Sequence, residues 1–328
     1  MAVSSVDVAR RAGTSTAVVS YVFNDGPRGV APQTREKVLR AAAELGYRPN
    51  RMARALRSGT TGFIGVLVPD SSIPFFAELT RALVSALGRR QHLALVSHAG
   101  ISGRSEIETI EALLSAQVDG LLVTAFWQES HADLRSDVPV VYVHHKPPQA
   151  VGQLIGSDNA HATLAAVDHL VDVHGIDKPG FWTGPDDAGP LGERIDAWRD
   201  RCRTGDAGLV RSHFSAADAE RVFLELVERE EVPRALIVAT DQQATGILAG
   251  AYAADVHVPE DLAIISLDGA TETAYTAPAL TVMQQPLEQM ADDAVAVLLG
   301  EIETAPQRQA RLVPRRSCGC VYAPLSGS

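Results

Sequence analysis

The stretch VDVARRAGTSTAVVSYVFN at residues 6–24 contains two short helical patterns on either side of a glycine. Ser4 and Asp7 have the spacing of a capping box, in which each side chain accepts the other residue's backbone N–H at the start of a helix. Gly13 follows two turns later, and glycine commonly ends a helix because it adopts positive φ without strain. The sequence therefore predicts a first helix of about two turns that ends at Gly13.

Two further helices are predicted in the same region. Ser15 is placed to cap the second helix, whose buried side is marked by Val18, Val19 and Val22. The third helix is expected to begin near Pro32 and to end at Gly46, with an apolar face formed by Val38, Leu39, Ala42 and Leu45. Three short helices with a glycine in the first turn predict a helix-turn-helix module, which is a DNA-binding unit.

Charge is distributed unevenly along the chain. Residues 1–62 contain ten Arg or Lys against four Asp or Glu, whereas the remainder contains 19 against 36, and the formal net charge of the whole is -11. A basic head on an acidic body indicates that only the head meets a polyanion such as double-stranded DNA.

Length and composition set the remaining limits. At 328 residues, with 46% hydrophobic and 21% charged residues, the chain is expected to form two or three globular domains. There is no apolar run of 18 residues and no secretory signal, so we expect a cytoplasmic protein without a membrane partner. Three cysteines do not make a disulfide framework, and no cofactor is expected.

From residue 63 onward the pattern is that of an α/β protein. Short apolar runs alternate with helical segments; the runs are FIGVLV, LALVS, GLLVTA, VPVVYV, PGFWTG, ALIVAT and LAIISL. Such runs are typical of strands buried on both faces of a parallel sheet. The alternation is longer than one sheet of about 150 residues requires, so we expect two doubly wound subdomains.

Four of the strands are followed by polar groups that contain an aspartate, namely Asp70, Asp158, Asp241 and Asp268. Ligands of open parallel sheets bind at the carboxyl ends of the strands. Carboxylates at that edge suit the hydroxyl groups of a sugar or nucleoside. Because an aspartate after a strand also commonly caps the next helix, capping is expected for Asp70 and Asp241 and a ligand contact for Asp268.

The head resembles the LacI/GalR family of bacterial transcription regulators, through DVARRAG, VSYVFN, TREKV, ELGYRPN and RMARALRSGTTGFIGV. The resemblance implies that Thr16, Ala17 and Tyr21 face base edges in the major groove. Further contacts, mainly to phosphates, are expected from Ser4, Thr14, Ser15, Ser20, Asn24 and Arg51. Local capping is the alternative role for Ser15 and Asn24.

The same resemblance identifies residues 50–57 as a hinge helix. Leu56 would enter the minor groove as an apolar wedge at a central base step, with Arg54 and Arg57 beside it. Residues 58–62, SGTTG, have the composition of a flexible joint. Ordinary packing of Leu56 is the alternative.

The resemblance extends through the body and implies a periplasmic-binding-protein-like fold that closes around its ligand. Ile73 and Thr240 stand where relatives carry Asn, so any amide contact at those positions is lost. LTVMQQP would be the last crossover between subdomains. The effector residues expected from the resemblance and from the aspartates are Phe75, Phe76, Asp158, Arg194, Phe214, Thr240, Asp241 and Asp268.

The expected organisation is a head at residues 1–49, a hinge and linker at 50–62, and two effector-binding subdomains. The first subdomain would comprise residues 63–160 and 286–312, and the second residues 161–285 and 313–328. The fold class is therefore multidomain: an all-α helix-turn-helix head, then an α/β body of two doubly wound parallel sheets.

Catalytic and metal motifs are not found. The sequence has no Walker A, G-x-S-x-G, H-E-x-x-H or Rossmann glycine motif, so no enzyme activity is expected. The histidines His144, His145, His169 and His174 lack metal-site spacing and are expected on the surface. Cys318 and Cys320 could bind a soft metal or form a redox pair, but two thiols are half of a zinc shell, and an inert strand is expected.

These features together predict a ligand-responsive transcription regulator, expected to be a repressor. A homodimer would bind a pseudo-palindromic operator, because two-fold protein symmetry matches half-site symmetry. Without a leucine heptad after Pro324, a dimer is favoured over a tetramer. The alternatives are a sugar-binding protein without a DNA role, which leaves the basic head unexplained, and a sugar-processing enzyme, which lacks an acid–base constellation.

Overall fold

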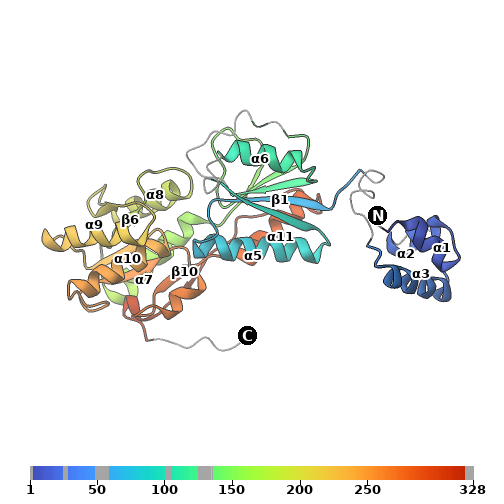
Figure 1. The fold of residues 1–328 in the computed structure, drawn as a ribbon. Helices are drawn as coiled ribbons and strands as arrows, with labels where there is room; N and C mark the ends of the chain where they lie inside the picture. Colours follow the sequence, from blue (N-terminus) through green and yellow to red (C-terminus); the bar gives the residue numbers. More distant parts are fainter. Residues whose placement is uncertain are drawn as a thin grey trace. The chain divides into compact units, whose positions relative to one another are not determined.

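The computed structural model describes residues 3–24, 29–48, 59–99, 105–124, 134 and 136–321. Its contacts divide the chain into two compact units, Met1–Thr61 and Gly62–Ser328, here called the head and the body (Figure 1). The predicted hinge at residues 50–57 lies outside the described residues.

The head contains three helices, α1 (Ser5–Ala12), α2 (Thr16–Asn24) and α3 (Pro32–Leu45). The predicted capping box is confirmed: the Ser4 backbone N–H donates to the Asp7 carboxylate over 3.0 Å, and the Asp7 backbone N–H donates to the Ser4 hydroxyl over 3.4 Å. Gly13 ends α1 with φ 65°. Both ends of α1 are therefore where the local sequence places them.

The start of α2 and both ends of α3 also follow the prediction. The Val18 backbone N–H donates to the Ser15 hydroxyl over 3.3 Å, so Ser15 caps α2. Pro32 begins α3, and Gly46 ends it with φ 67°. The predicted apolar face of α3 is wrong at Leu39, which is 44% exposed. The helical period directs its neighbour Val38 inward and turns Leu39 about 100° away.

The core of the head consists of small side chains, which let three short helices approach closely. Its buried members are Val8, Ala9, Val19, Val22, Val38, Ala41 and Ala42. Phe23 and Tyr47 meet edge to face at its border, with ring centroids 5.7 Å apart.

The first half of the body is a five-stranded parallel sheet in the order β2-β1-β3-β4-β5. The strands are β1 (Phe63–Val68), β2 (Leu93–His98), β3 (Gly120–Val123), β4 (Val140–Val143) and β5 (Gln153–Ile155). One face is covered by α5 (Pro74–Arg89) and α11 (Leu287–Leu298), the other by α6 (Glu106–Ser115).

The second half is a six-stranded sheet in the order β11-β10-β9-β8-β6-β7. Its strands are β6 (Gly180–Thr183), β7 (Leu209–Arg211), β8 (Ala235–Val238), β9 (Ala263–Ser266), β10 (Thr281–Gln284) and the antiparallel β11 (Arg311–Val313). The helices α7 (Asn159–His174) and α8 (Pro190–Cys202) cover one face, and α9 (Ala216–Glu228) and α10 (Asp241–Ala253) cover the other. Two short 3-10 helices, η1 (Thr271–Tyr275) and η2 (Arg316–Cys318), complete this half.

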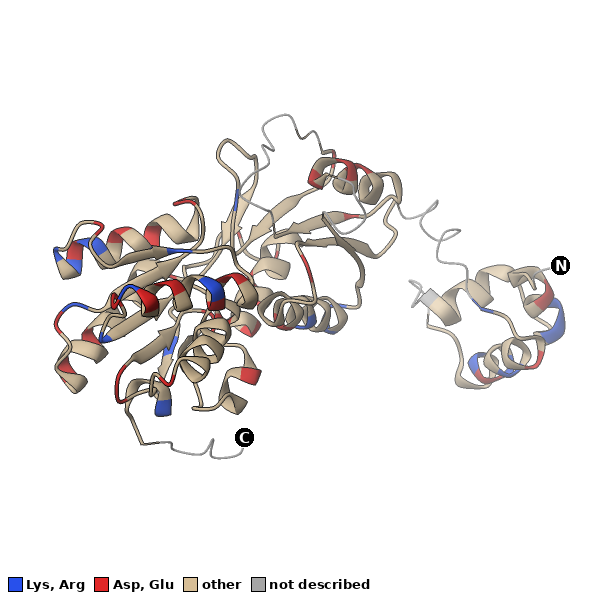
Figure 2. Cartoon of the chain, turned by 60° about the vertical axis from the view of Figure 1, so that its left-hand side comes forward, with Lys and Arg blue, Asp and Glu red and all other residues tan. Residues whose placement is uncertain are grey.

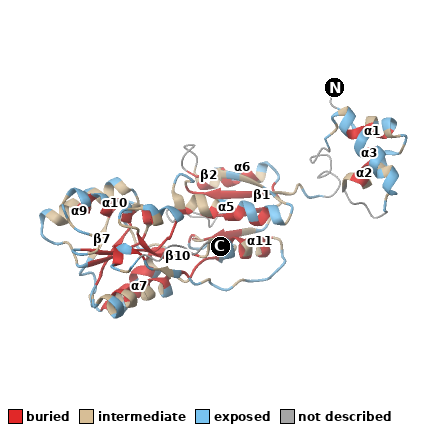
Figure 3. Ribbon diagram, turned by 90° about the horizontal axis from the view of Figure 1, so that it is seen from below, coloured by how far each residue is buried: buried red, intermediate tan, exposed pale blue. Residues whose placement is uncertain are grey.

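The seven apolar runs predicted as strands all contain strands, which confirms the doubly wound architecture. The inner strands β1, β3, β4, β6, β8, β9 and β10 carry no Lys, Arg, Asp or Glu, and charge gathers on helices and loops (Figure 2). The helices are buried on the side that faces a sheet (Figure 3). One expectation is wrong: β2 is an edge strand, and its Leu93 and Val96 are 46% and 40% exposed.

The chain crosses between the two halves three times: between β5 and α7, between β10 and α11, and between α11 and β11. These crossings lie together, because the Ser157 hydroxyl donates to Gln285 over 2.7 Å and Ser157 forms a β-bridge with Arg308. Because β11 belongs to the second sheet, we propose residues 286–310 rather than 286–312 for the returning part of the first half.

No helix in the described part of the chain is long and apolar enough to span a bilayer.

Candidate effector pocket and nucleic-acid interface

The surface of the head that could contact DNA lies along α2. Ser15, Thr16 and Ala17 are exposed at its start, and Ser20 and Tyr21 are half-buried one turn further along. Thr16 and Ser20, like Ala17 and Tyr21, are four residues apart and so share one face. That face is opposite the buried valines, because the helix buries only one stripe.

Several predicted contacts have a structural role or lie outside the described residues. The Ser4 and Ser15 hydroxyls both cap helices. Hydrogen bonds from Ser4 lower the pKa of Asp7. Thr14 is half-buried in the turn after Gly13. The remaining predicted contacts, which are the side chain of Asn24 together with Arg51, Arg54, Leu56 and Arg57, lie outside the described residues.

Part of the positive charge of the head is paired within it. Arg11 of α1 reaches Glu44 of α3 at 2.6 Å, and Arg40 pairs with Glu36 one turn away at 2.7 Å. All four side chains are exposed, so these pairs contribute little to stability, although the first links two helices.

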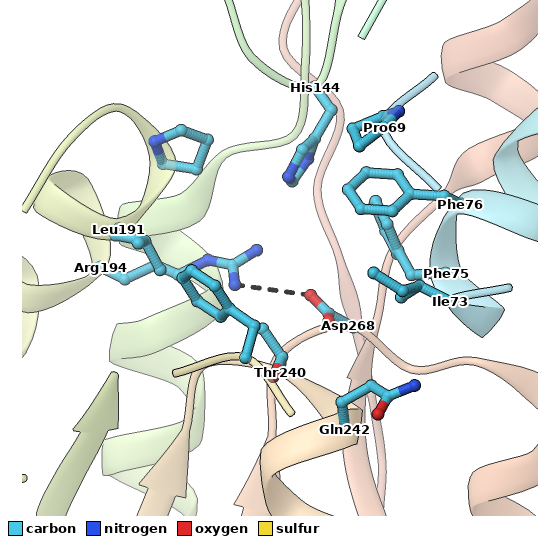
Figure 4. Close-up of a pocket in the computed structure, with 12 residues that line it drawn as sticks. Pro69, Ile73, Phe75, Phe76, His144, Leu191, Arg194, Thr240, Gln242 and Asp268 are labelled. Carbon is cyan, nitrogen blue, oxygen red and sulfur yellow. Dashed lines mark ion pairs between the residues drawn. The ribbon is translucent and has the colours of Figure 1, made fainter. Parts of the chain in front are cut away.

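The body contains a cavity of about 120 Å³ at the carboxyl ends of strands from both halves. The first half contributes Pro69, after β1, His144, after β4, and three residues near the start of α5, namely Ile73, Phe75 and Phe76. The second half contributes Pro190, Leu191, Arg194, Phe214, Thr240, Gln242 and Asp268 (Figure 4). Six of the eight predicted effector residues line this one pocket.

The two walls of the pocket differ in chemistry. In Figure 4 the side chains of α5 form a largely apolar wall, and Arg194 and Asp268 face it from the second half. Arg194 Nη1 lies 3.5 Å from Asp268 Oδ1, and the two side chains are only 3% and 10% exposed. A mostly apolar lining with a few converging polar groups is typical of a small-molecule site.

Arg194 is held in place but not saturated. Its Nε donates to Asn159 over 3.0 Å and its Nη1 donates to the Ala239 carbonyl over 2.7 Å. Its Nη2 is buried and has no hydrogen-bond partner among the described residues. Because an unsatisfied buried donor costs free energy, this atom is available to a ligand acceptor in the pocket.

Burial shifts the titration of two groups that line the pocket. It raises the pKa of Asp268 to about 7, with Arg194 opposing the shift and Asp241 adding to it. It lowers the pKa of His144 to about 3, an effect to which Arg194 and His145 add. At neutral pH His144 is therefore an uncharged ring that can donate or accept, and Asp268 is close to half ionised.

Aromatic rings form much of the remaining lining. The His144 ring lies 4.9 Å from the Phe75 ring and 6.3 Å from the Phe76 ring, centroid to centroid. On the second half, the Phe214 ring lies against Gly184, where any Cβ would overlap it. The glycine after β6 is thus what allows Phe214 to reach the pocket.

Two predicted effector residues do not line the pocket. Asp158 caps α7 by accepting the His161 backbone N–H over 2.8 Å. Asp241 is buried beneath the loop after β9, where it accepts the Ala270 backbone N–H over 2.7 Å. Both carboxylates accept hydrogen bonds from main-chain N–H groups. A carboxylate at a strand end can reach such groups as easily as it can reach a ligand.

The capping roles expected for Asp70 and Asp241 are also wrong. The α10 cap is Thr240, which accepts the Gln243 backbone N–H over 3.3 Å. Asp70 accepts the Ser72 backbone N–H over 2.7 Å in the loop before α5, whose own cap is Ile73. The loop between β1 and α5 is longer than the expectation assumed, so Asp70 lies too far before the helix to cap it.

The surface location expected for the histidine pair is wrong as well. His144 lines the pocket, and His145 is buried against Gly189. Sequence reasoning also missed Gln242 and the apolar lining residues Pro69, Ile73, Pro190 and Leu191. A signal was present for His144, because it directly follows a buried strand, much as Asp241 and Asp268 follow theirs by two or three residues.

Comparison with known proteins agrees with this architecture. Residues 6–50 match the sequence model of the bacterial regulatory proteins of the lacI family, and residues 167–318 match that of a periplasmic binding protein-like domain. Catabolite control protein A of Priestia megaterium is 31% identical over 297 residues, which cover 88% of this chain and 89% of that protein. The ribose operon repressor of Escherichia coli (strain K12) is 30% identical over 318 residues, covering 93% and 95%.

A crystal structure of the lac repressor dimer bound to operator and the anti-inducer ONPF has the same fold. The TM-score is 0.83 at 24% identity, covering 97% of this chain and 99% of that chain. With relatives at 30% identity or more over nearly its whole length, the chain belongs to the lacI family of bacterial regulatory proteins, which are transcription regulators rather than enzymes.

Proposed function

We propose that this regulator binds a pseudo-palindromic DNA operator as a homodimer and that a sugar or related polyol in the body pocket modulates this binding. The observation that carries the effector part is the buried Arg194, which lines an otherwise mainly apolar pocket and whose Nη2 has no partner among the described residues. The DNA part rests on family membership and on the exposed start of α2.

The chemistry of the pocket favours a neutral polyhydroxylated ligand. Arg194 offers a donor, Asp268 offers an acceptor when ionised, and Thr240 and Gln242 add further polar groups. Adjacent hydroxyls both donate and accept, so they can satisfy a guanidinium and a carboxylate that lie 3.5 Å apart. The C–H faces of a sugar ring match the aromatic wall formed by Phe75, Phe76 and Phe214.

The same arrangement supplies a route to the operator. The ligand would contact walls from both halves of the body, which in the described part of the chain are connected by the three crossings near Ser157 and Gln285. A ligand that binds one angle between the halves better than another shifts the population of the two states. The two states would differ in the half of the body that the chain enters after the head. Effector binding would therefore be linked to operator binding, and operator affinity would change.

In the head, we propose that Thr16, Ala17 and Tyr21 determine the half-site. Thr16 offers one hydroxyl and Ala17 an apolar contact suited to a thymine methyl group. The hinge contacts proposed for Leu56, Arg54 and Arg57 would fix the centre of the operator.

Exposed apolar side chains on the first half support the homodimer. Val84 of α5 and Leu93 and Val96 of β2 are 42%, 46% and 40% exposed, and β2 is the edge of its sheet. Ala94 packs against the α5 cluster, so Val96, two residues on, lies on the α5 face with Val84, and such exposed apolar side chains form the kind of surface that a second copy covers.

Sedimentation velocity tests the dimer. Val96→Arg is expected to shift the protein from two chains to one at micromolar concentration, because it places a charge in the apolar contact. Val173→Arg is the matched control, since Val173 is 60% exposed on α7 of the other half and its replacement should leave the dimer intact. Equal association of the two variants would exclude this interface.

Selection from randomised duplex DNA with the purified protein tests operator recognition. At a fixed salt concentration of about 0.1 M, we expect an enriched palindrome of about 16–20 base pairs with a flexible central pyrimidine–purine step. Exchanging Thr16, Ala17 and Tyr21 together should change the half-site, whereas Gln33→Ala, an exposed control on α3, should not. An unchanged half-site in the triple variant would refute the assignment.

A thermal-shift panel of sugars and nucleosides tests the effector class. A ligand of the folded protein raises its Tm in proportion to the logarithm of its concentration above Kd. We expect at least one neutral polyol to stabilise the body and to change operator affinity. Stabilisation only by anionic or apolar compounds would contradict the polyol assignment.

A further inference from the structure

Two histidines of α7 and two cysteines, one ending η2 and one just after it, lie together on the second half of the body, away from the pocket lining. The ligand atoms of His169, His174, Cys318 and Cys320 all lie within 4.8 Å of one another. His169 and Cys318 are 149 residues apart in sequence, so only the fold brings the two pairs together.

The separations within this cluster match a tetrahedral metal shell. The two Nε2 atoms are 3.3 Å apart, and Nε2–Sγ separations of 3.5 Å join His169 to both cysteines and His174 to Cys320. Zinc bonds of about 2.0–2.1 Å to nitrogen and 2.3 Å to sulfur place tetrahedral ligand atoms about 3.3–3.8 Å from each other. Four of the six separations therefore match a tetrahedral shell, and the other two are no longer than 4.8 Å.

We propose that His169, His174, Cys318 and Cys320 form a Cys2His2 site for Zn²⁺. Two thiolates and two imidazoles are the donor set that selects zinc among the common divalent cations. Because the protein supplies all four ligands, no coordination position is left for water or substrate, and the role is structural. The ion ties the segment after β11 to α7.

The residues around the cluster are arranged for this role. Gly319 separates the two cysteines with φ 102°, and a Cβ there would lie 3.3 Å from the His174 ring. A larger residue would thus be strained in backbone conformation and crowded against a ligand. The Thr281 hydroxyl lies 3.1 Å from Cys318 Sγ, where it can donate to a thiolate and orient it as outer-shell hydrogen bonds do.

An ion can enter the cluster and is then enclosed. Cys318 is buried, whereas His169, His174 and Cys320 are half-buried. Zinc binding replaces the thiol protons of the cysteines, which pass to the solvent.

The test is metal analysis of the full-length protein. Protein purified with a thiol reductant and without chelator is expected to retain about one zinc ion per chain. When Co²⁺ is added to the metal-free protein, the thiolate-to-cobalt charge-transfer band and the intense visible bands of tetrahedral cobalt should appear. Cys320→Ser and His174→Gln should lose retained zinc and these bands.

Two replacements serve as matched controls. His161→Gln changes an exposed histidine of the same helix, and Cys202→Ala changes the remaining cysteine. Cys202 is the buried last residue of α8, and both controls should retain zinc like the parent. Gly319→Ala keeps all four ligands and should weaken zinc retention, which separates ligand geometry from ligand loss.

Thermal unfolding supplies a second readout on the unmodified protein. A chelator should lower the Tm of the parent and of both controls, and should leave the Tm of Cys320→Ser unchanged. The proposal is overturned if the parent retains no more zinc than Cys320→Ser, if Co²⁺ gives only weak octahedral bands, or if Cys318 and Cys320 form a disulfide in metal-free protein from reducing cells.

Discussion

In the head, the predicted DNA contacts at the start of α2 are exposed and consecutive, whereas in the body the residues that face the pocket are buried or half-buried and come from both halves. Ser15, Thr16 and Ala17 need only α2 and its cap to be in place. Arg194 and Asp268 are 3% and 10% exposed, and they meet only because α8 and β9 pack in one half.

The difference has an energetic meaning. The exposed groups of the head have lost little hydration, so DNA contacts only have to replace water. The polar groups of the pocket have already lost water on folding, and one donor of Arg194 has gained no described partner in return. Substitutions in the pocket should therefore have the larger effects on ligand affinity.

The largest expected effect belongs to Arg194→Met. It removes the charged donor of the pocket, and hydrogen bonds to charged groups contribute about 1.5–3 kcal/mol each, so effector affinity should fall about 100-fold. Calorimetric titration with the polyol identified by the panel measures the change. Operator binding without effector should persist.

Arg201→Met is the control, because Arg201 is an exposed arginine of the same helix that pairs with Asp168 at 2.8 Å. Its effector affinity should equal that of the parent. An Arg194→Met affinity within threefold of the parent, in a protein with unchanged Tm, would remove the basis of the effector site.

The second largest effect is expected for Val38→Ala, a replacement in the core of the head. Val38 is fully buried, and the lost methyl groups and the resulting cavity should destabilise the head by about 2 kcal/mol. Amide hydrogen exchange should accelerate in α1, α2 and α3, while exchange in the body and effector affinity stay the same, since the two are separate compact units.

Leu39→Ala tests the corrected face of α3 in the same experiment. Its side chain is exposed, so its replacement should change stability by no more than about 0.5 kcal/mol. If Leu39→Ala destabilised the head as much as Val38→Ala, the packing described for α3 would be wrong.

The pH dependence of effector binding is expected to be the next largest effect. The pKa of Asp268 is raised to about 7, so its carboxylate, which accepts ligand hydroxyls, is mostly protonated at pH 6 and mostly ionised at pH 8. Effector affinity should therefore increase with pH by about tenfold across this interval. Asp268→Asn should abolish the dependence.

Asp158→Asn provides the comparison for this pH series. Asp158 caps α7 outside the pocket lining, and Asn is an equally good cap, so the pH profile should match that of the parent. A flat profile in the parent would show that Asp268 does not accept a hydrogen bond from the effector.

The smallest effect is expected for Ser4→Ala. Loss of the cap should destabilise α1 by about 1 kcal/mol, because the Asp7 backbone N–H loses its acceptor. Faster exchange of that amide and a modest loss of operator affinity are the measurements. Gln33→Ala, at an exposed position near the start of α3, should leave both unchanged.

Local sequence was sufficient for the head and for the strand pattern of the body. The caps at Ser4 and Ser15 and the helix ends at Gly13 and Gly46 depend on side chains within a few residues, and each was confirmed. Leu39 was misplaced because two adjacent apolar residues fit the helical period almost equally well, and only packing against α1 and α2 distinguishes them.

The pocket was predictable in part. Arg194, Asp268 and the aromatic residues could be named from motifs, but Asp158 and Asp241, which were named with them, do not line the pocket. Asp241 and Asp268 follow buried strands and Asp158 follows the edge strand β5, and the neighbouring backbone N–H groups decide which carboxylates remain for a ligand. Those N–H groups belong to loops whose course depends on the packing of the helices that follow.

The sequence by itself determined the helix-turn-helix head, the alternation of strands and helices, and the family. It did so because caps, glycine turns and apolar periodicity act over a few residues. Only the tertiary structure decided that His144 joins the pocket, and that His169 and His174 meet Cys318 and Cys320. Long-range packing brought these groups together, and no local pattern of residues records which distant side chains will share a site.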